Sequence, residues 1–130
     1  MKNSEVIVYS FTVEDGVKSG EFIDMDELAK EAGIKFKTVF SRNLFNSYIV
    51  PSEKDAKWGQ CIDGRAWDVF TMFKYALKNR TESVKRPHRF EFETIFLTNG
   101  SHKTVNLVAV IQAYNESGEP CLTISLPEDD

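Results

Sequence analysis

The last third of the chain constrains the fold most, because apolar and polar residues alternate along three successive segments. The segments RFEFETIF (89–96), TVNLVAVIQAY (104–114) and CLTISL (121–126) carry apolar residues at every second position or nearly so. This period of two is typical of strands that bury one face. Turn signals separate them, with NG at 99–100 and NESGEP at 115–120. The pattern predicts an antiparallel meander.

A long amphipathic helix is predicted just before the meander, over about 64–79. Asp63 is a suitable N-cap residue for it. At 100° per residue, six apolar side chains fall in one arc and form a core-facing stripe. They are Ala66, Val69, Phe70, Phe73, Ala76 and Leu77. The fold class predicted is therefore α+β: a short N-terminal strand and helices, then one long helix packed on an antiparallel sheet formed by the C-terminal meander.

The first part of the chain predicts small elements. EVIVY at 5–9 has the pattern of a short buried strand. Thr12 can cap a short helix that ends near Gly20, and the FI pair at 22–23 is a brief extended piece.

Two further short helices follow. Asp24 and Glu27 have the spacing of a capping box, and Gly33 suits the left-handed end of the same helix. Ser41 is placed to cap the next helix, which ends before Pro51. The polar residues 51–62 are expected to form a loop.

Length and composition indicate one domain spanning 1–130. The chain is 42% hydrophobic with ten Phe, enough for a substantial core. No apolar run approaches the roughly 18 residues of a membrane span, and the first ten residues lack the apolar stretch of a signal peptide. We expect a cytoplasmic protein that does not enter a membrane.

No motif in the sequence predicts catalysis, a metal or a cofactor. Cys61 and Cys121 are far apart and without metal-ligand spacing, so two reduced thiols are expected. His88 and His102 are expected to be exposed and belong to no HExxH pattern. Glycine-rich phosphate-binding motifs and GxSxG are absent from the sequence. We expect no enzyme, no metal site and no cofactor.

The stretch DGRAWDVF at the start of the long helix allows two interpretations. Arg65 and Asp68 are three residues apart on one flank, as in an ion pair on a helix surface. Trp67 lies on the opposite flank, at the edge of the core stripe. The first interpretation is a helix start that packs well. The second is a docking site, because Trp and Arg are favoured anchors in protein interfaces.

Charge is unevenly distributed along a chain whose net charge is −4. Residues 78–90 carry five Lys or Arg against one Glu. This segment is interpreted as a solvated connector, and Lys85, Arg86 and Arg89 make it a candidate contact for phosphates or for a protein. The acidic end PEDD is expected to be a frayed tail.

Several stretches together resemble a family of small proteins of unknown function found on bacterial chromosomes, plasmids and phages. The most specific are GRAWDV (64–69) and GEPCLTISLPEDD (118–130), which are similar to the family's GR-WDV and GEP-TI-LP segments. The resemblance covers nearly the whole chain, although KSGEF (18–22) is an insertion and the chain ends PEDD without the family's glycine. It implies a protein associated with mobile genetic elements.

The leading hypothesis is a non-catalytic binding protein that modulates a host or element-encoded protein. Its candidate contacts are Arg65, Trp67 and Asp68, together with segment 85–89. The alternative is a nucleic-acid-associated protein that uses the basic segment 78–89. An exposed helix flank is also typical of a homodimer surface.

Overall fold

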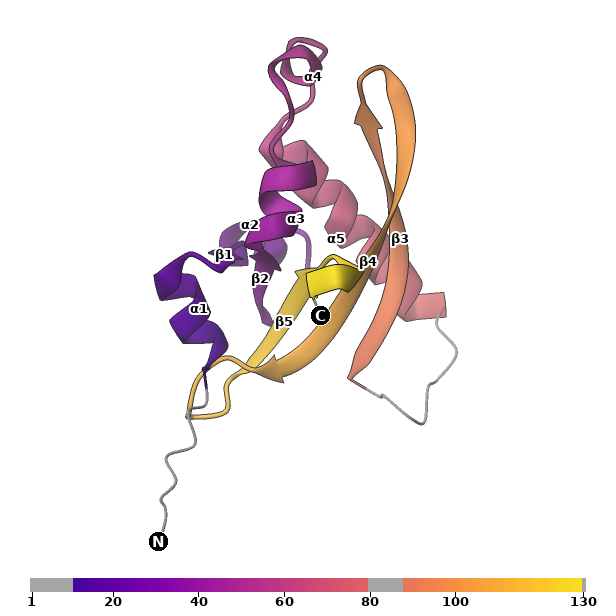
Figure 1. Ribbon diagram of the computed structural model, residues 1–130. Helices are drawn as coiled ribbons and strands as arrows, with labels where there is room; N and C mark the ends of the chain where they lie inside the picture. The colour runs from indigo at the N-terminus through magenta and orange to yellow at the C-terminus, as the bar shows by residue number, and fades with distance from the viewer. Residues whose placement is uncertain (1–10, 80–87, 130) are drawn as a thin grey trace, which may run out of the picture.

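A five-stranded mixed sheet organises the chain, and a computed structural model describes residues 11–79 and 88–129 of it (Figure 1). The strand order is β1-β2-β5-β4-β3. Neighbours are antiparallel except β2 and β5, which are parallel. The strands are β1 (Phe22–Asp24), β2 (Lys37–Ser41), β3 (Arg89–Thr98), β4 (Ser101–Ala113) and β5 (Pro120–Ser125).

The predicted C-terminal meander is confirmed. A two-residue turn joins β3 to β4, and both Asn99 and Gly100 have positive φ, 53° and 78°. This conformation matches the twist of a tight hairpin. Figure 1 shows the hairpin projecting beyond the rest of the sheet. The predicted strand at 5–9 lies outside the described residues.

The predicted α+β class, with one long helix packed on the sheet, is confirmed, and the sheet is larger than the meander and mixed, because β1 and β2 join it. Strand β2 was not predicted, and it lies inside the sheet between β1 and β5. Its neighbouring residues Val39 and Phe40 are both buried, on opposite faces. Alternation of buried and exposed residues is therefore missing from β2, and the strand gives no period-two signal.

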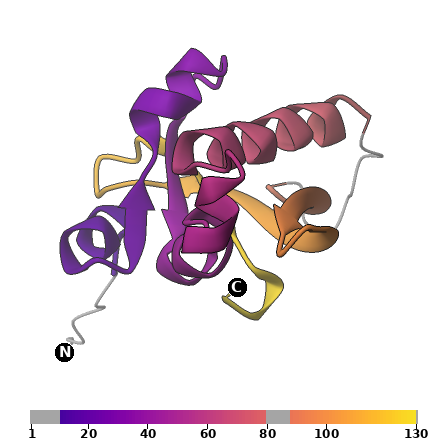
Figure 2. The same ribbon diagram turned by 90° about the horizontal axis from the view of Figure 1, so that it is seen from above.

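Helix α5 (Ile62–Asn79) covers one face of the sheet, as predicted (Figure 2). Ala66, Val69, Phe70 and Phe73 are buried in the core between α5 and the sheet. Leu77 is an exception, since it is 44% exposed where the helix extends beyond the core. The remaining helical elements are α1 (Val13–Ser19), α2 (Asp26–Glu31), α3 (Arg42–Leu44), the π-helix η1 (Phe45–Ile49), α4 (Glu53–Lys57) and the 3-10 helix η2 (Pro127–Asp129).

A second, smaller cluster fills the opposite face of the sheet. It joins Val13 of α1 to Val39, Tyr114 and Cys121. Thr12 caps α1 with the reciprocal bonds of a capping box, and Gly20 ends the helix in the left-handed conformation, as predicted.

Helix α2 begins at Asp26, one residue later than an Asp24 cap implies. Asp24 is still in β1, where it pairs with Val39, and the Met25 N–H donates to the carbonyl of Thr38. The Asp24 carboxylate accepts from the Asp26 N–H at 2.8 Å, but no capping box with Glu27 forms. Sheet pairing therefore overrides the local capping signal.

The segment predicted as a loop at 51–62 contains a helix. Ser52 caps α4 by accepting from the Asp55 N–H at 3.1 Å. Helix α5 then begins at Ile62, because the carbonyl of Cys61 accepts from the Arg65 N–H. The predicted cap, Asp63, thus lies in the first turn, where a negative charge suits the helix dipole.

The acidic end of the chain is ordered as far as Asp129, contrary to the prediction of a frayed tail. The Asp129 carboxylate accepts hydrogen bonds from the Ser41 hydroxyl at 2.9 Å, the Asn43 amide at 3.1 Å and the Leu126 N–H at 3.3 Å. Ser41 itself caps α3, as predicted, by accepting from Leu44 N–H. The end of the chain therefore secures the junction between β2 and α3.

This anchor predicts that Asp129→Ala lowers the free energy of unfolding by about 1–2 kcal/mol, because charge-assisted hydrogen bonds to Ser41 and Asn43 are lost. Urea denaturation followed by circular dichroism measures the change. Glu128→Ala, at the exposed neighbouring carboxylate, is the matched control and should change stability little. Equal stabilities for the two variants would contradict the anchor.

Candidate functional site

Arg65, the first charged residue of GRAWDV, is buried and fully engaged by the protein. It is 3% exposed. Its guanidinium donates to the carbonyls of Tyr48 at 2.7 Å and Leu97 at 2.5 Å, and to the side chains of Asp55 and Gln60 at 3.3 Å. Asp55 is also buried, so the two form a buried ion pair.

The expected surface ion pair between Arg65 and Asp68 is therefore wrong. Arg65 points toward α4, η1 and the hairpin instead, and it is inaccessible to a partner. The Asp55 carboxylate also accepts from the Asn99 N–H at 2.9 Å, which ties α4 to the hairpin turn at the same end of the molecule (Figure 1). We assign Arg65 a structural role.

Trp67 is 42% exposed and lies on α5 one turn after Asp63, which lines a groove; Trp67 itself is not among the lining residues. Because Trp67 is one turn after Asp63 on α5, both side chains lie on the flank that faces α2. The groove between α2, η1 and the start of α5 has a volume of about 700 Å³. We call it the acidic groove. It is lined by Ile23, Asp24, Met25, Asp26, Glu27, Leu28, Lys30, Glu31, Phe45, Ile62 and Asp63.

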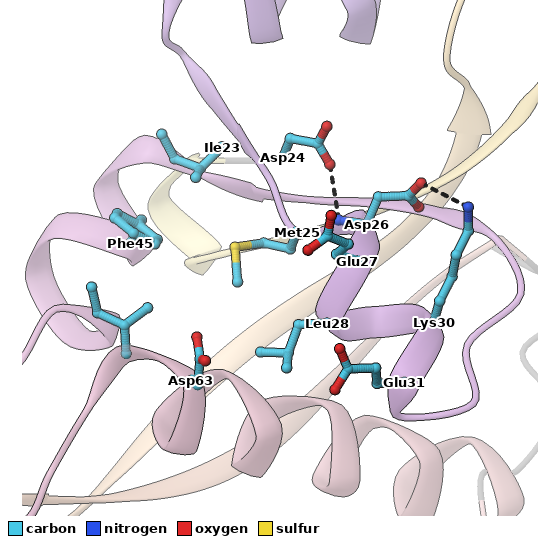
Figure 3. A pocket seen from close by; sticks show the side chains of 11 residues that line it. Ile23, Asp24, Met25, Asp26, Glu27, Leu28, Lys30, Glu31, Phe45 and Asp63 are labelled. Carbon is cyan, nitrogen blue, oxygen red and sulfur yellow. Dashed lines mark hydrogen bonds and ion pairs between the residues drawn. The ribbon is translucent and has the colours of Figure 1, made fainter.

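The acidic groove combines apolar walls with a carboxylate rim. Figure 3 shows Met25 and Leu28 directed toward the space between the helices, with the carboxylates of Glu27, Glu31 and Asp63 around it. Five Asp or Glu and a single Lys line it. That lysine, Lys30, pairs with Asp26 at 3.2 Å. The rim therefore presents an excess of negative charge around an apolar surface.

Asp68 lies on the other flank of α5, in a second groove between this helix and β3. This groove, of about 500 Å³, we call the edge groove. Its lining residues are Gln60, Asp68, Thr71, Met72, Thr94, Ile95, Leu97 and His102. Burial raises the pKa of the Asp68 carboxyl above its ordinary value, and the nearby positive charge of Arg65 offsets part of the shift.

The structure thus brings Asp68 and His102 to the same groove. No hydrogen bond between their side chains is present in the part of the chain that the structure describes. His88 and His102 are both exposed, as predicted. Cys121 is buried, and desolvation raises the pKa of its thiol to about 12, which suppresses its reactivity. Over residues 11–79 and 88–129, no group of three or more His, Cys, Asp or Glu could hold a metal ion.

The candidate residues of the basic segment are only partly described. Lys85 and Arg86 lie outside the described residues. Arg89 begins β3, is half-buried, and pairs with Glu91 at 3.4 Å. The structure therefore places Arg89 on a strand and away from the acidic groove.

The residues of the acidic groove were missed by sequence reasoning. Glu27 was predicted to belong to a capping box and Asp63 to cap the long helix, whereas no role was predicted for Glu31. The only available signal was the density of carboxylates in IDMDELAKE, which helix dipole effects also explain. Their convergence depends on α2 packing beside α5, which is a tertiary contact.

Comparisons with known proteins identify no relative from which a function could be transferred. No protein-family model, curated protein or solved structure matches the chain. None of the helices in the described ranges is long and apolar enough to span a bilayer.

The buried pair predicts that Arg65→Met strongly destabilises the fold, by about 3–5 kcal/mol, because it leaves the Asp55 carboxylate buried without its cation. Thermal or urea unfolding measures the loss. Arg42→Met, at an exposed arginine, is the control. A partner-facing role for Arg65 would instead leave stability unchanged.

A second prediction concerns how the free energy of unfolding depends on pH through Asp68. Its raised pKa means that the charged carboxylate costs stability above that pKa, and that this cost disappears as pH falls through it. Asp68→Asn should therefore raise the free energy of unfolding at pH 7, by at most about 1 kcal/mol because solvent screens the site. The difference should vanish at low pH.

Asp15→Asn supplies a control of opposite sign. Hydrogen bonds from Thr12 lower the pKa of the Asp15 carboxyl, so its charged form stabilises the folded state above the ordinary pKa. This variant should lose stability at pH 7 and match the wild type at low pH. Parallel urea titrations at several pH values measure both, and the same sign for both variants would contradict the analysis.

Proposed function

We propose that this chain is a small non-catalytic binding protein that modulates a partner protein by holding a basic, apolar segment of it in the acidic groove. The observation that carries the proposal is the groove itself, in which half-buried apolar walls are surrounded by carboxylates, and those of Glu27, Glu31 and Asp63 form no ion pair among the described residues. A positively charged segment with apolar side chains is complementary to both features. Trp67 beside the groove is a suitable anchor, since exposed tryptophans are favoured at interface centres.

The proposal keeps Trp67 as a docking residue and sets Arg65 aside as structural. The resemblance of GRAWDV and GEPCLTISLPEDD to small chromosomal, plasmid and phage proteins supports an association with mobile elements. We propose that the partner is a host or element-encoded protein in the cytoplasm. The carboxylate rim repels phosphates, so nucleic acid is a poorer occupant of this groove.

The proposal predicts that Trp67→Ala weakens partner binding by about 2 kcal/mol, or roughly thirtyfold in Kd. The tagged protein is used to capture partners from bacterial lysate with and without nuclease. The captured protein is then identified, purified and titrated against each variant. Trp58→Ala, at the other tryptophan, 66% exposed and outside the groove, is the matched control.

Charge reversal tests the groove separately from the tryptophan. Glu27→Lys combined with Glu31→Lys should abolish binding, whereas Glu116→Lys, in an exposed turn, should not. Binding that survives the groove reversal would refute the proposal. Capture that depends on nucleic acid would instead favour the basic segment 78–89.

A further inference from the structure

We infer that the outer edge of β3, which pairs with no further strand among residues 11–79 and 88–129, is a second binding site, which takes an extended basic segment of a partner protein as an additional strand. The site goes beyond the proposed function, because it lies on the flank of α5 opposite Trp67. Strand β3 has ten residues and ends the sheet, whereas the strand at the other edge, β1, has three. A long edge strand presents a row of backbone donors and acceptors for another strand.

Hydrogen-bond alternation defines which backbone groups face outward. The Ile111 N–H donates to the carbonyl of His88 at 2.8 Å, and these two residues are opposite each other in the register that β3 and β4 continue. The backbone N–H and C=O groups of every second residue, counted from His88, therefore bond to β4. The backbone groups of the residues between them point away from β4. Glu91, Glu93 and Ile95 belong to the outward-pointing set.

One outward-pointing carbonyl of β3 already accepts a hydrogen bond from a group outside the sheet, the guanidinium of Arg65. The carbonyl of Leu97 is in the same set, and the guanidinium of Arg65 bonds to it. The protein therefore closes its own edge at Leu97, next to the hairpin turn. The adjoining stretch from Glu91 to Ile95 is where a partner strand would pair.

The edge groove gives such a strand a place for its side chains. Met72 of α5 and Ile95 of β3 line it, and Ile95 is 52% exposed. Thr94 also lines the groove and is 0% exposed, yet its hydroxyl has no hydrogen-bond partner within the part of the chain that the structure describes. A buried hydroxyl without a partner is unfavourable, so a bound polar group that reaches it would remove this cost.

Charge selects a basic segment over a second copy of the chain. The exposed carboxylate of Glu93 flanks the edge, Glu91 beside it pairs with Arg89, and Asp68 lies across the groove. Pairing two copies of β3 around Glu93 would place two glutamates directly opposite each other, which destabilises a strand pair. A strand that alternates Lys or Arg with apolar residues complements both the carboxylates and the apolar walls.

A defined peptide tests the inference without knowledge of the natural partner. The probe is a fluorescent peptide as long as β3 that alternates lysine and valine, titrated by anisotropy. Two matched peptides serve as controls: one alternates glutamate and valine, and one is the lysine peptide N-methylated at every residue. We expect both controls to bind about tenfold more weakly or worse, since one loses charge complementarity and the other its backbone donors.

Two variants of Glu93 separate the contribution of its backbone N–H to peptide binding from that of its carboxylate. Glu93→Pro removes one outward N–H without touching the bonds to β4, a position at which an edge strand tolerates proline. We expect it to bind the lysine peptide about tenfold more weakly than Glu93→Ala, which keeps the N–H. Because the acidic groove should also take a basic, apolar peptide, the comparison of Glu93→Pro with Glu93→Ala is repeated in the Glu27→Lys/Glu31→Lys protein, where the tenfold difference should remain if the edge binds the peptide.

Amide hydrogen exchange on the unmodified chain provides a readout that does not depend on a variant folding. Bound peptide should slow exchange at the amides of Glu91, Glu93 and Ile95. Equal binding of the N-methylated peptide, or unchanged exchange at these amides, would overturn the inference. So would sedimentation showing a dimer of the free chain with the same amides protected, because the occupant would then be a second copy.

Discussion

The arrangement of helices and hairpin depends on the burial of a single guanidinium. Removing a charge from water is costly unless its donors are satisfied and a counterion is near. Arg65 meets this requirement with acceptors from three separate parts of the chain, at Tyr48, Asp55 and Leu97. Because each must come within hydrogen-bond distance, η1, α4 and the hairpin are held in fixed positions around the start of α5. The face of the Phe96 ring, 5.7 Å from the guanidinium, contributes to the same site.

Fixing the start of α5 also creates two distinct surfaces on its flanks. One flank meets α2 and forms the acidic groove beside Trp67, and the other meets β3 and forms the edge groove beside Asp68. The residues of GRAWDV therefore differ in their surroundings. Its arginine is structural, whereas its tryptophan and aspartate lie on surfaces open to a partner. A helix held this rigidly presents its side chains with little loss of entropy on binding, which favours affinity.

Local patterns predicted those elements whose residues are periodic along the sequence. The strands of the meander, the core stripe of α5 and the Thr12 cap could all be predicted, because each depends on a pattern among residues close together in the sequence. Strand β2 was not, since burial on both faces removes its alternation. The partners of Arg65 lie 10, 17 and 32 residues away, at Asp55, Tyr48 and Leu97. No local spacing encodes such contacts, so both grooves that depend on them were also beyond prediction.

An open strand edge carries a risk of aggregation, and the way this chain limits that risk also defines its selectivity. Proteins commonly protect edges with charged side chains, which repel copies of the same strand. Glu93 has this effect on β3, and the bond from Arg65 to Leu97 closes one end. A carboxylate that repels an identical acidic edge attracts a basic one. Protection against self-association and preference for a basic partner strand therefore follow from the same side chain.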